Sequence, residues 1–155
     1  MGLSFVLHHS VKSETEKVKP FFEHIERFAE LHPLIQSATK SGEKEYIIRE
    51  RMPFSFFRFN YKADVSVHNG NEVQYIAYPF FLIMTIKFKF VFSKEDNATM
   101  ITESVHIKGP PVISHILKNA VIGSHKKILE GVKKLVESWT LSNEGHTTDV
   151  LVSFI

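Results

Sequence analysis

Apolar and polar residues alternate along two stretches of the chain, residues 3–11 and residues 34–108. A period of two places the apolar side chains on one face of a β-strand. The first stretch predicts a single strand, and turn signals such as Asn69-Gly70 divide the second stretch into about six strands. The predicted strands after the first cover residues 34–39, 44–52, 56–67, 72–78, 84–92 and 98–108.

Between the first two strands the pattern changes to helical spacing. Ser13 and Glu16 have the spacing of a capping box, in which two side chains satisfy unpaired donors at a helix start. Apolar residues then recur every three or four positions as far as Leu31. Because Pro20 lacks a donor and collides with the preceding turn, we expect either one kinked helix or two short ones.

A second helical pattern covers residues 112–139, after a break at Gly109-Pro110-Pro111. Proline suits the first position of a helix, because its missing donor would have no partner there. One apolar stripe runs from Ile113 to Trp139, and a helix of this length would span roughly 42 Å at 1.5 Å per residue. Residues 140–155 follow as a tail that opens with polar residues and ends in an apolar, strand-like segment.

This order of elements predicts an α+β fold. A curved antiparallel sheet of six or seven strands with one apolar face has to cover that face, and the helix at 112–139 is the predicted element long enough to do so. We therefore expect residues 1–139 to form one domain, with two short helices after the first strand and the long helix across the concave side of the sheet. The tail, 140–155, is a candidate for an added strand.

In order and spacing, this pattern resembles the helix-grip fold of the SRPBCC superfamily, which includes START lipid-transfer domains, the birch-pollen allergen family and polyketide cyclase/dehydrase-like proteins. The resemblance is carried by the strand 5–11, the Ser13 capping box, the segment 28–34 and the break at Gly109-Pro110-Pro111. These residues include no diagnostic catalytic motif. The resemblance implies a cavity between the sheet and the long helix that binds an apolar ligand.

The residues themselves leave the interior open to two interpretations. The predicted inward strand faces carry large side chains, whereas the facing helix offers the small residues Ala120, Gly123 and Ser124. Large side chains opposite small ones can interdigitate into a solid core, or they can leave space between the layers. If there is a cavity, we expect its ligand-binding residues to be His9, Tyr46, Phe57, Phe59, Tyr61, Met84, Phe88, Phe90, Glu103, Leu117, Ala120 and Ser124.

Two carboxylates stand out because each shares a predicted strand face with apolar residues. Burial would raise the pKa of Glu103 or Glu50 toward values useful for acid or base catalysis, unless hydrogen bonds stabilise the charge. Either residue could equally reach water or pair with a nearby arginine. Together with Tyr46, Tyr61 and His9, Glu103 would orient the polar end of a ligand. No residue is assigned as catalytic.

The nine histidines do not predict a metal site, because no two of them have the four-residue helical spacing of a zinc motif. His8 and His9 are adjacent on a strand and point to opposite faces. His115 and His125 would lie about 15 Å apart along one helix. The chain also lacks a glycine-rich phosphate loop and a Gly-x-Ser-x-Gly elbow. We therefore expect no metal and no cofactor.

Composition narrows the class of protein further. The 155 residues are 43% hydrophobic, enough for one real core, and the absence of cysteine excludes disulfide scaffolds and thiol chemistry. The net charge of +2 is spread along the chain, so we expect no nucleic-acid partner. With no secretory signal and no apolar run of about 18 residues, we expect a cytoplasmic protein without a transmembrane segment.

Two aromatic clusters, residues 53–57 and 78–82, place more apolar surface near strand ends than alternation can bury. If exposed, they could form the lip of the cavity, a weak membrane contact or a homodimer contact. If buried, they extend the core round the sheet edge.

The leading hypothesis is therefore a protein that binds or carries an apolar or amphipathic small molecule, such as a lipid, an isoprenoid or a polyketide-like compound. One alternative is a cyclase or dehydratase that uses a cavity carboxylate or tyrosine for proton transfer. The other is a protein-interaction module with a filled core.

Overall fold

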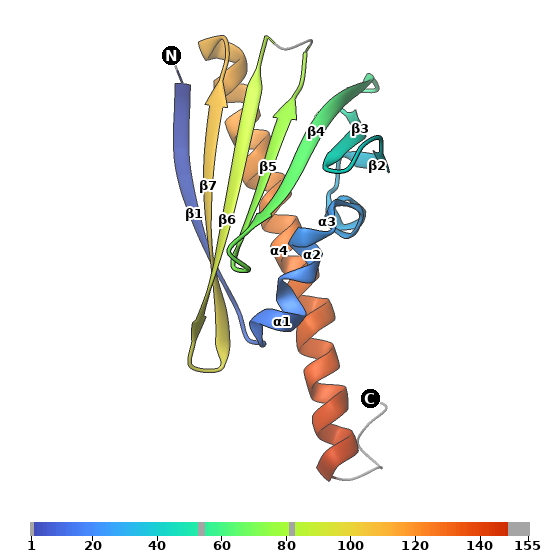
Figure 1. Ribbon diagram of the computed structural model, residues 1–155, viewed down its shortest axis with the longest axis vertical. Coiled ribbons are helices and arrows are strands. Elements are labelled where there is room, and N and C mark those ends of the chain that lie inside the picture. The colour runs from blue at the N-terminus through green and yellow to red at the C-terminus, as the bar shows by residue number, and fades with distance from the viewer. Residues whose placement is uncertain (1, 53–54, 81–82, 149–155) are drawn as a thin grey trace.

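The structure is a computed structural model in which residues 2–52, 55–80 and 83–148 are described, with side chains described as far as residue 138. Seven strands form one antiparallel sheet in the order β1-β7-β6-β5-β4-β3-β2 (Figure 1). The strands are β1 Gly2–Val11, β2 Ile35–Lys40, β3 Glu45–Arg51, β4 Arg58–His68, β5 Glu72–Tyr78, β6 Thr85–Glu95 and β7 Ala98–Lys108. The predicted sheet is confirmed, with small shifts at strand ends.

The sheet is a meander from β2 to β7, to which β1 is added at the far edge. β1 pairs antiparallel with β7, from Gly2 opposite Lys108 to Val11 opposite Thr99. The turn between β4 and β5 has positive φ at both Asn69 and Gly70, as a tight hairpin of this type requires. Because β1 and β7 are neighbours, residues at the two ends of the strand sequence can share one site.

Three short helices follow β1: α1 Thr15–Val18, α2 Pro20–Glu23 and α3 Ile25–Leu31. Lys19 keeps helical dihedrals between α1 and α2, so Pro20 marks a kink there. His24 has an extended conformation and separates α2 from α3. The segment is therefore both kinked at Pro20 and broken at His24.

The predicted capping box at Ser13 does not form. α1 begins at Thr15, its N-cap is Glu14, and no side chain caps it. The hydroxyl of Thr99 on β7 donates instead to the backbone carbonyl of Ser13, at 2.7 Å. A tertiary hydrogen bond from the neighbouring strand thus fixes the chain where the local pattern predicted a cap.

The long helix α4, Pro111–Thr148, begins where the proline pattern predicted and crosses one face of the sheet (Figure 1). It is longer than predicted, because the helix continues through residues 140–148, which were expected to open the tail. The strand-like end of that tail, residues 149–155, lies outside the described residues. No helix in the described part of the chain combines the length and apolar character that spanning a bilayer requires.

The aromatic inward faces produce a solid core over only part of the sheet. Phe22 of α2 is fully buried, with ring centroids 5.0 Å from Phe90 and 5.3 Å from Phe92. The later turns of α4 complete this core with Ile128 and Val132. The earlier turns of α4 cover a different region of the sheet, toward the end at which the helix begins.

Candidate functional site

A largely apolar cavity lies between the sheet and α4, beside the solid core. Its walls come from α3, from strands β2 to β6 and from α4, with Phe28, Phe59, Phe88 and Leu117 among the lining residues. The cavity has a volume of about 90 Å³. This space exceeds the roughly 10 to 15 Å³ that a cavity needs to hold a water molecule, but it is smaller than the roughly 300 Å³ or more of a typical ligand pocket. The interior is thus neither completely filled, as the interaction-module hypothesis required, nor preformed for a large ligand.

An open groove of about 740 Å³ adjoins the cavity. Leu34, Ala120 and Ser124 line both spaces, so they mark the passage between them. On its outer side the groove is bordered by Phe56 and by Ile116 of α4. Because the two spaces share these side chains, we call the groove the mouth of the cavity.

Two aromatic rings are stacked at one wall of the cavity. The rings of Phe59 and Phe80 have centroids 5.3 Å apart and planes inclined by 16°. Phe80 has a φ of 56°, in the left-handed region that a bulky side chain rarely adopts. Phe80 therefore has a strained backbone conformation, and its ring packs against Phe59 in that conformation.

The first polar group of the cavity is a hydrogen-bonded pair from adjacent strands. The Tyr61 hydroxyl donates to Oε2 of Glu50 at 2.6 Å, and both side chains line the cavity. Burial raises the pKa of Glu50, while the Tyr61 hydrogen bond and the nearby His125 oppose that change. Burial and the adjacent Glu50 raise the pKa of Tyr61 well above its ordinary value. The pKa of Glu50 is therefore raised by its burial in the cavity wall, and Tyr61 remains a neutral donor.

The second polar group crosses from β7 to α4. Glu103 is completely buried, and its Oε1 accepts a hydrogen bond from Nδ1 of His125. Nε2 of His9, on the neighbouring strand β1, lies 3.6 Å from the other carboxylate oxygen. Burial by itself would raise the pKa of Glu103, but the two histidines stabilise the charge and lower the pKa to about 2. Glu103 is therefore an ionised partner of His125.

His32 provides a third polar group, at the end of α3. Its Nδ1 accepts hydrogen bonds from the backbone N–H groups of Leu34 and Ile35, each at 3.2 Å. Burial and the neighbouring His125 lower the pKa of His32 to about 3. The ring is thus neutral at physiological pH, and it fixes the turn from α3 into β2 at the cavity wall.

Together these groups give the cavity a defined chemistry. Glu103 holds Nδ1 of His125, which leaves Nε2 as the ring nitrogen free of that contact, and the His125 side chain lines the cavity. A histidine oriented through one nitrogen by a carboxylate can donate to, or take a proton from, a group at the other. An apolar wall with a few convergent polar groups is the usual composition of a small-molecule site.

Half of the twelve residues predicted to bind a ligand line the cavity. These are Phe59, Tyr61, Phe88, Leu117, Ala120 and Ser124. They come from the inward faces of β4 and β6 and from one stripe of α4. For these positions, the strand and helix periods place the side chains correctly.

The other six predicted residues lie elsewhere, for separate reasons. Phe57 precedes β4 and is 76% exposed, so its predicted inward orientation is wrong. Phe90 is fully buried among the rings of the solid core, and Tyr46 packs against that core. Met84 is buried beside Gly109, away from the cavity lining. His9 and Glu103 lie behind His125, so they reach the cavity only through it.

Sequence reasoning omitted three polar residues from the predicted site. The sequence argument treats His125 only as a possible metal ligand. Its position, four residues after Val121 and eight after Leu117, nevertheless places it on the same apolar helical stripe. The helical pattern ends at His32-Pro33, and Glu50 is predicted either as a buried acid or as a residue that reaches water or pairs with a nearby arginine, so neither belongs to the predicted ligand-binding set. The signal for His125 was present in the spacing, whereas the proximity of His32 and Glu50 depends on the tertiary structure. Among the described residues, no cluster of three or more His, Asp or Glu side chains could hold a metal ion.

Comparison with known proteins places the fold, although neither a protein-family model nor a curated protein sequence matches the chain. Among solved structures, Ara h 8.0201 is similar with a TM-score of 0.66 at 15% identity, and the match covers 85% of this chain and 98% of that chain. A START superfamily protein from Mycobacterium smegmatis has a TM-score of 0.68 at 10% identity, with coverage of 88% and 98%. The di-domain ARO/CYC StfQ from the steffimycin biosynthetic pathway has a TM-score of 0.76 at 8% identity, and the match covers 90% of this chain and 52% of StfQ.

These similarities and the topology identify the architecture as the helix-grip fold. The seven-stranded antiparallel sheet, the short helices after β1 and the long C-terminal helix all agree with it. At identities of 8 to 15%, the comparisons establish the fold and leave the ligand to be argued from the site.

Proposed function

We propose that this protein binds an apolar or amphipathic small molecule in the cavity between the sheet and α4. The observation that carries the proposal is the composition of the cavity, whose apolar walls surround the Tyr61–Glu50 pair and His125. Burial of apolar ligand surface would supply the affinity, at roughly 25 cal/mol per Å² before the costs of association. Tyr61, Glu50 and His125 would hold the polar end.

The size of the cavity adds a condition to this proposal. Because about 90 Å³ is too small for a lipid or a polyketide-like compound, binding requires movement of the side chains near the mouth. Ala120 and Ser124 are small residues at the passage, so a ligand can enter there without displacing a large helix side chain. The stacked pair Phe59 and Phe80 is the group whose separation would enlarge the space.

Uptake of an environment-sensitive apolar dye, followed by fluorescence, tests this function, and native mass spectrometry of the purified protein reports any ligand that copurifies. We expect saturable dye binding by the wild type and a large loss in Ala120→Phe, which places a ring in the passage. Lys126→Phe is the matched control, because it adds the same side chain to an exposed position of α4 outside the cavity and the groove. Equal dye binding by Ala120→Phe and the wild type would remove the basis of the proposal.

A proton-transfer enzyme is the second candidate, because Glu50 combines burial, a raised pKa and a place in the cavity wall. Such an enzyme would remove a proton from the carbon next to a ligand carbonyl and return it elsewhere. A long-chain methyl ketone in D₂O is a suitable probe, since abstraction and return of the proton exchange its α-hydrogens for deuterium. Catalysed exchange that is lost in Glu50→Gln and in His125→Phe would support this candidate, and exchange no faster than in buffer would eliminate it for this class of ligand.

A further inference from the structure

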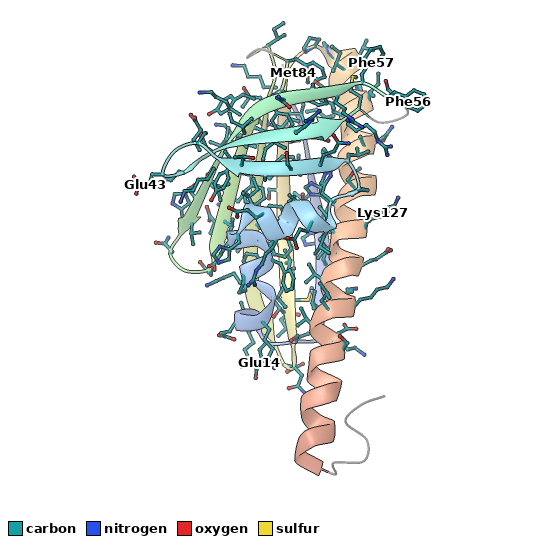
Figure 2. The ribbon with its side chains drawn as sticks, turned by 90° about the vertical axis from the view of Figure 1, so that its right-hand side faces the viewer. Glu14, Glu43, Phe56, Phe57, Met84 and Lys127 are labelled. Carbon is teal, nitrogen blue, oxygen red and sulfur yellow. The ribbon has the colours of Figure 1, made fainter. Side chains whose placement is uncertain are left out.

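Large apolar side chains are exposed around the mouth of the cavity. Phe56 and Phe57, before β4, are 97% and 76% exposed, and Val112 and Ile116, on the first turns of α4, are 73% and 61% exposed. Phe56 and Ile116 line the same groove, and Figure 2 shows Phe56 and Phe57 projecting at the end where α4 begins. We call these four residues the mouth patch. Single exposed apolar residues are common, but a group of this kind marks an interaction surface.

Cations without counter-charges adjoin the mouth patch. Arg51 and Lys127 line the groove with Phe56. Arg58 lies directly opposite Arg51 across the β3–β4 ladder, and both are exposed. No ion pair involving Arg51, Arg58 or Lys127 occurs among the described side chains. Like charges directly opposite each other on adjacent strands repel, so an external anion would relieve this arrangement.

Acidic residues are absent from the chain segments that build this end. Residues 73–94 and 104–129 contain no Asp or Glu, and residues 46–63 contain only Glu50, which is in the cavity wall. Of the two acids labelled in Figure 2, Glu14 lies toward the opposite end of the molecule, and Glu43 lies on the β2–β3 hairpin, on the side away from α4. Although the net charge is only +2, the acidic residues are distributed unevenly along the chain. The mouth patch is set in a surface that would attract anions and contains nothing to repel them.

We propose that the mouth patch and the adjacent cations dock this protein on the surface of an anionic lipid bilayer. Aromatic and aliphatic side chains insert at the boundary between headgroups and acyl chains, and arginine and lysine beside them bind anionic headgroups. A symmetric dimer through the same patch is disfavoured, because it would bring the unpaired arginines of two copies together. A protein partner would need an acidic surface around an apolar centre, whereas a bilayer offers both features at any point.

Docking in this orientation would join the membrane to the cavity. The groove faces the bilayer, and Leu34, Ala120 and Ser124 connect the groove to the cavity. An apolar ligand could then pass between bilayer and cavity without crossing water. This consequence rests on the proposed ligand binding, but the docking does not, because it needs only the outer surface.

Sedimentation of the full chain with lipid vesicles tests the docking. We expect binding to phosphatidylcholine vesicles that contain about one third phosphatidylserine, little binding to phosphatidylcholine alone, and weaker binding at high salt. Arg51→Gln combined with Arg58→Gln should weaken binding roughly 30-fold, since each cation near an anionic surface is worth about a factor of five. Phe56→Ala combined with Phe57→Ala should weaken it at least about tenfold.

Matched controls change the same residue types away from the mouth. Lys40→Gln with Lys44→Gln removes two exposed cations from the β2–β3 hairpin, and Val67→Ala shortens an exposed apolar residue near the β4–β5 turn. Both should bind vesicles like the wild type, and circular dichroism checks that every variant is folded.

Absence of binding to the anionic vesicles, or equal binding by wild type and mouth variants, would overturn the proposal. A dimer in light scattering that disappears in the Phe56/Phe57 variant would assign the patch to a second copy instead and would also overturn it. Dye uptake in solution without vesicles tests the cavity separately, so either proposal can fail alone.

Discussion

Nδ1 of His125 donates a hydrogen bond to the fully buried carboxylate of Glu103, which joins the long helix α4 to the strand β7 beneath it. The two residues are 22 positions apart, and the break at Gly109-Pro110-Pro111 lies between them. This contact orients the His125 ring, and the ring forms part of the cavity wall. It also gives the carboxylate a hydrogen-bond donor, without which its charge would be costly to bury.

We expect Glu103→Ala to lower the free energy of unfolding by about 3 to 5 kcal/mol, because it leaves His125 without its buried partner. Glu103→Gln keeps an acceptor and should fall between the wild type and Glu103→Ala. Urea denaturation at pH 7 measures both. Glu95→Ala, at an exposed hairpin position, is the control and should leave the midpoint unchanged. A midpoint for Glu103→Ala equal to that of the wild type would show that the pair does not stabilise the fold.

The stability of the protein should fall in acid because of His32. Its pKa is about 3 in the folded protein and 6.5 ordinarily, so the unfolded chain binds a proton more readily. The stabilisation is complete above pH 6.5 and is lost as the pH falls toward 3, at up to about 1.4 kcal/mol per pH unit. Glu103 adds a loss of the same sign between pH 4.5 and about 2. His32→Asn, which can still accept from the backbone of Leu34, should flatten the profile between pH 6.5 and 4.5 in urea melts, and an unchanged slope would contradict the assignment.

Truncation should reduce the stability much more at a buried phenylalanine than at an exposed one. Phe22→Ala removes a fully buried ring that packs against Phe28, Phe90 and Phe92, so we expect a loss of about 3 to 5 kcal/mol. Phe57→Ala removes a ring that is 76% exposed, and we expect a change within about 0.5 kcal/mol. Thermal and urea denaturation measure both. Comparable losses in the two variants would mean that the solid core is not centred on Phe22.

Glycine substitutions distinguish open from crowded positions. Gly123 is inside α4, and a Cβ there meets no atom within 4 Å, so Gly123→Ala should stabilise the protein by about 0.5 to 1 kcal/mol. A Cβ at Gly109 would lie 2.8 Å from two carbons of Met84, so Gly109→Ala should destabilise it by about 1 to 3 kcal/mol. Differential scanning calorimetry gives both values. If Gly123→Ala lowers the stability, the helix is not regular at that position.

The cavity and its lining could be predicted only in part. Phe59, Tyr61 and Phe88 were placed on the inward side by the period of two, and Ala120 by the helical stripe. The same periods gave no means of separating Phe88, which lines the cavity, from Phe90, which is two residues further along the same strand face. Their difference depends on Phe22 and Phe28, which fill the space next to Phe90 from α2 and α3.

By itself, the sequence determined the strands, their antiparallel arrangement, the position of the covering helix and the α+β class, because local periodicity and turn residues encode these features. The tertiary structure decided where the interior is solid and where it is hollow, and which ionisable groups meet. Glu103 receives its partners from β1 and α4, and Glu50 receives Tyr61 across β3 and β4. Such contacts join residues distant in the chain, and their pKa values depend on burial and charge that exist only after the layers have packed together.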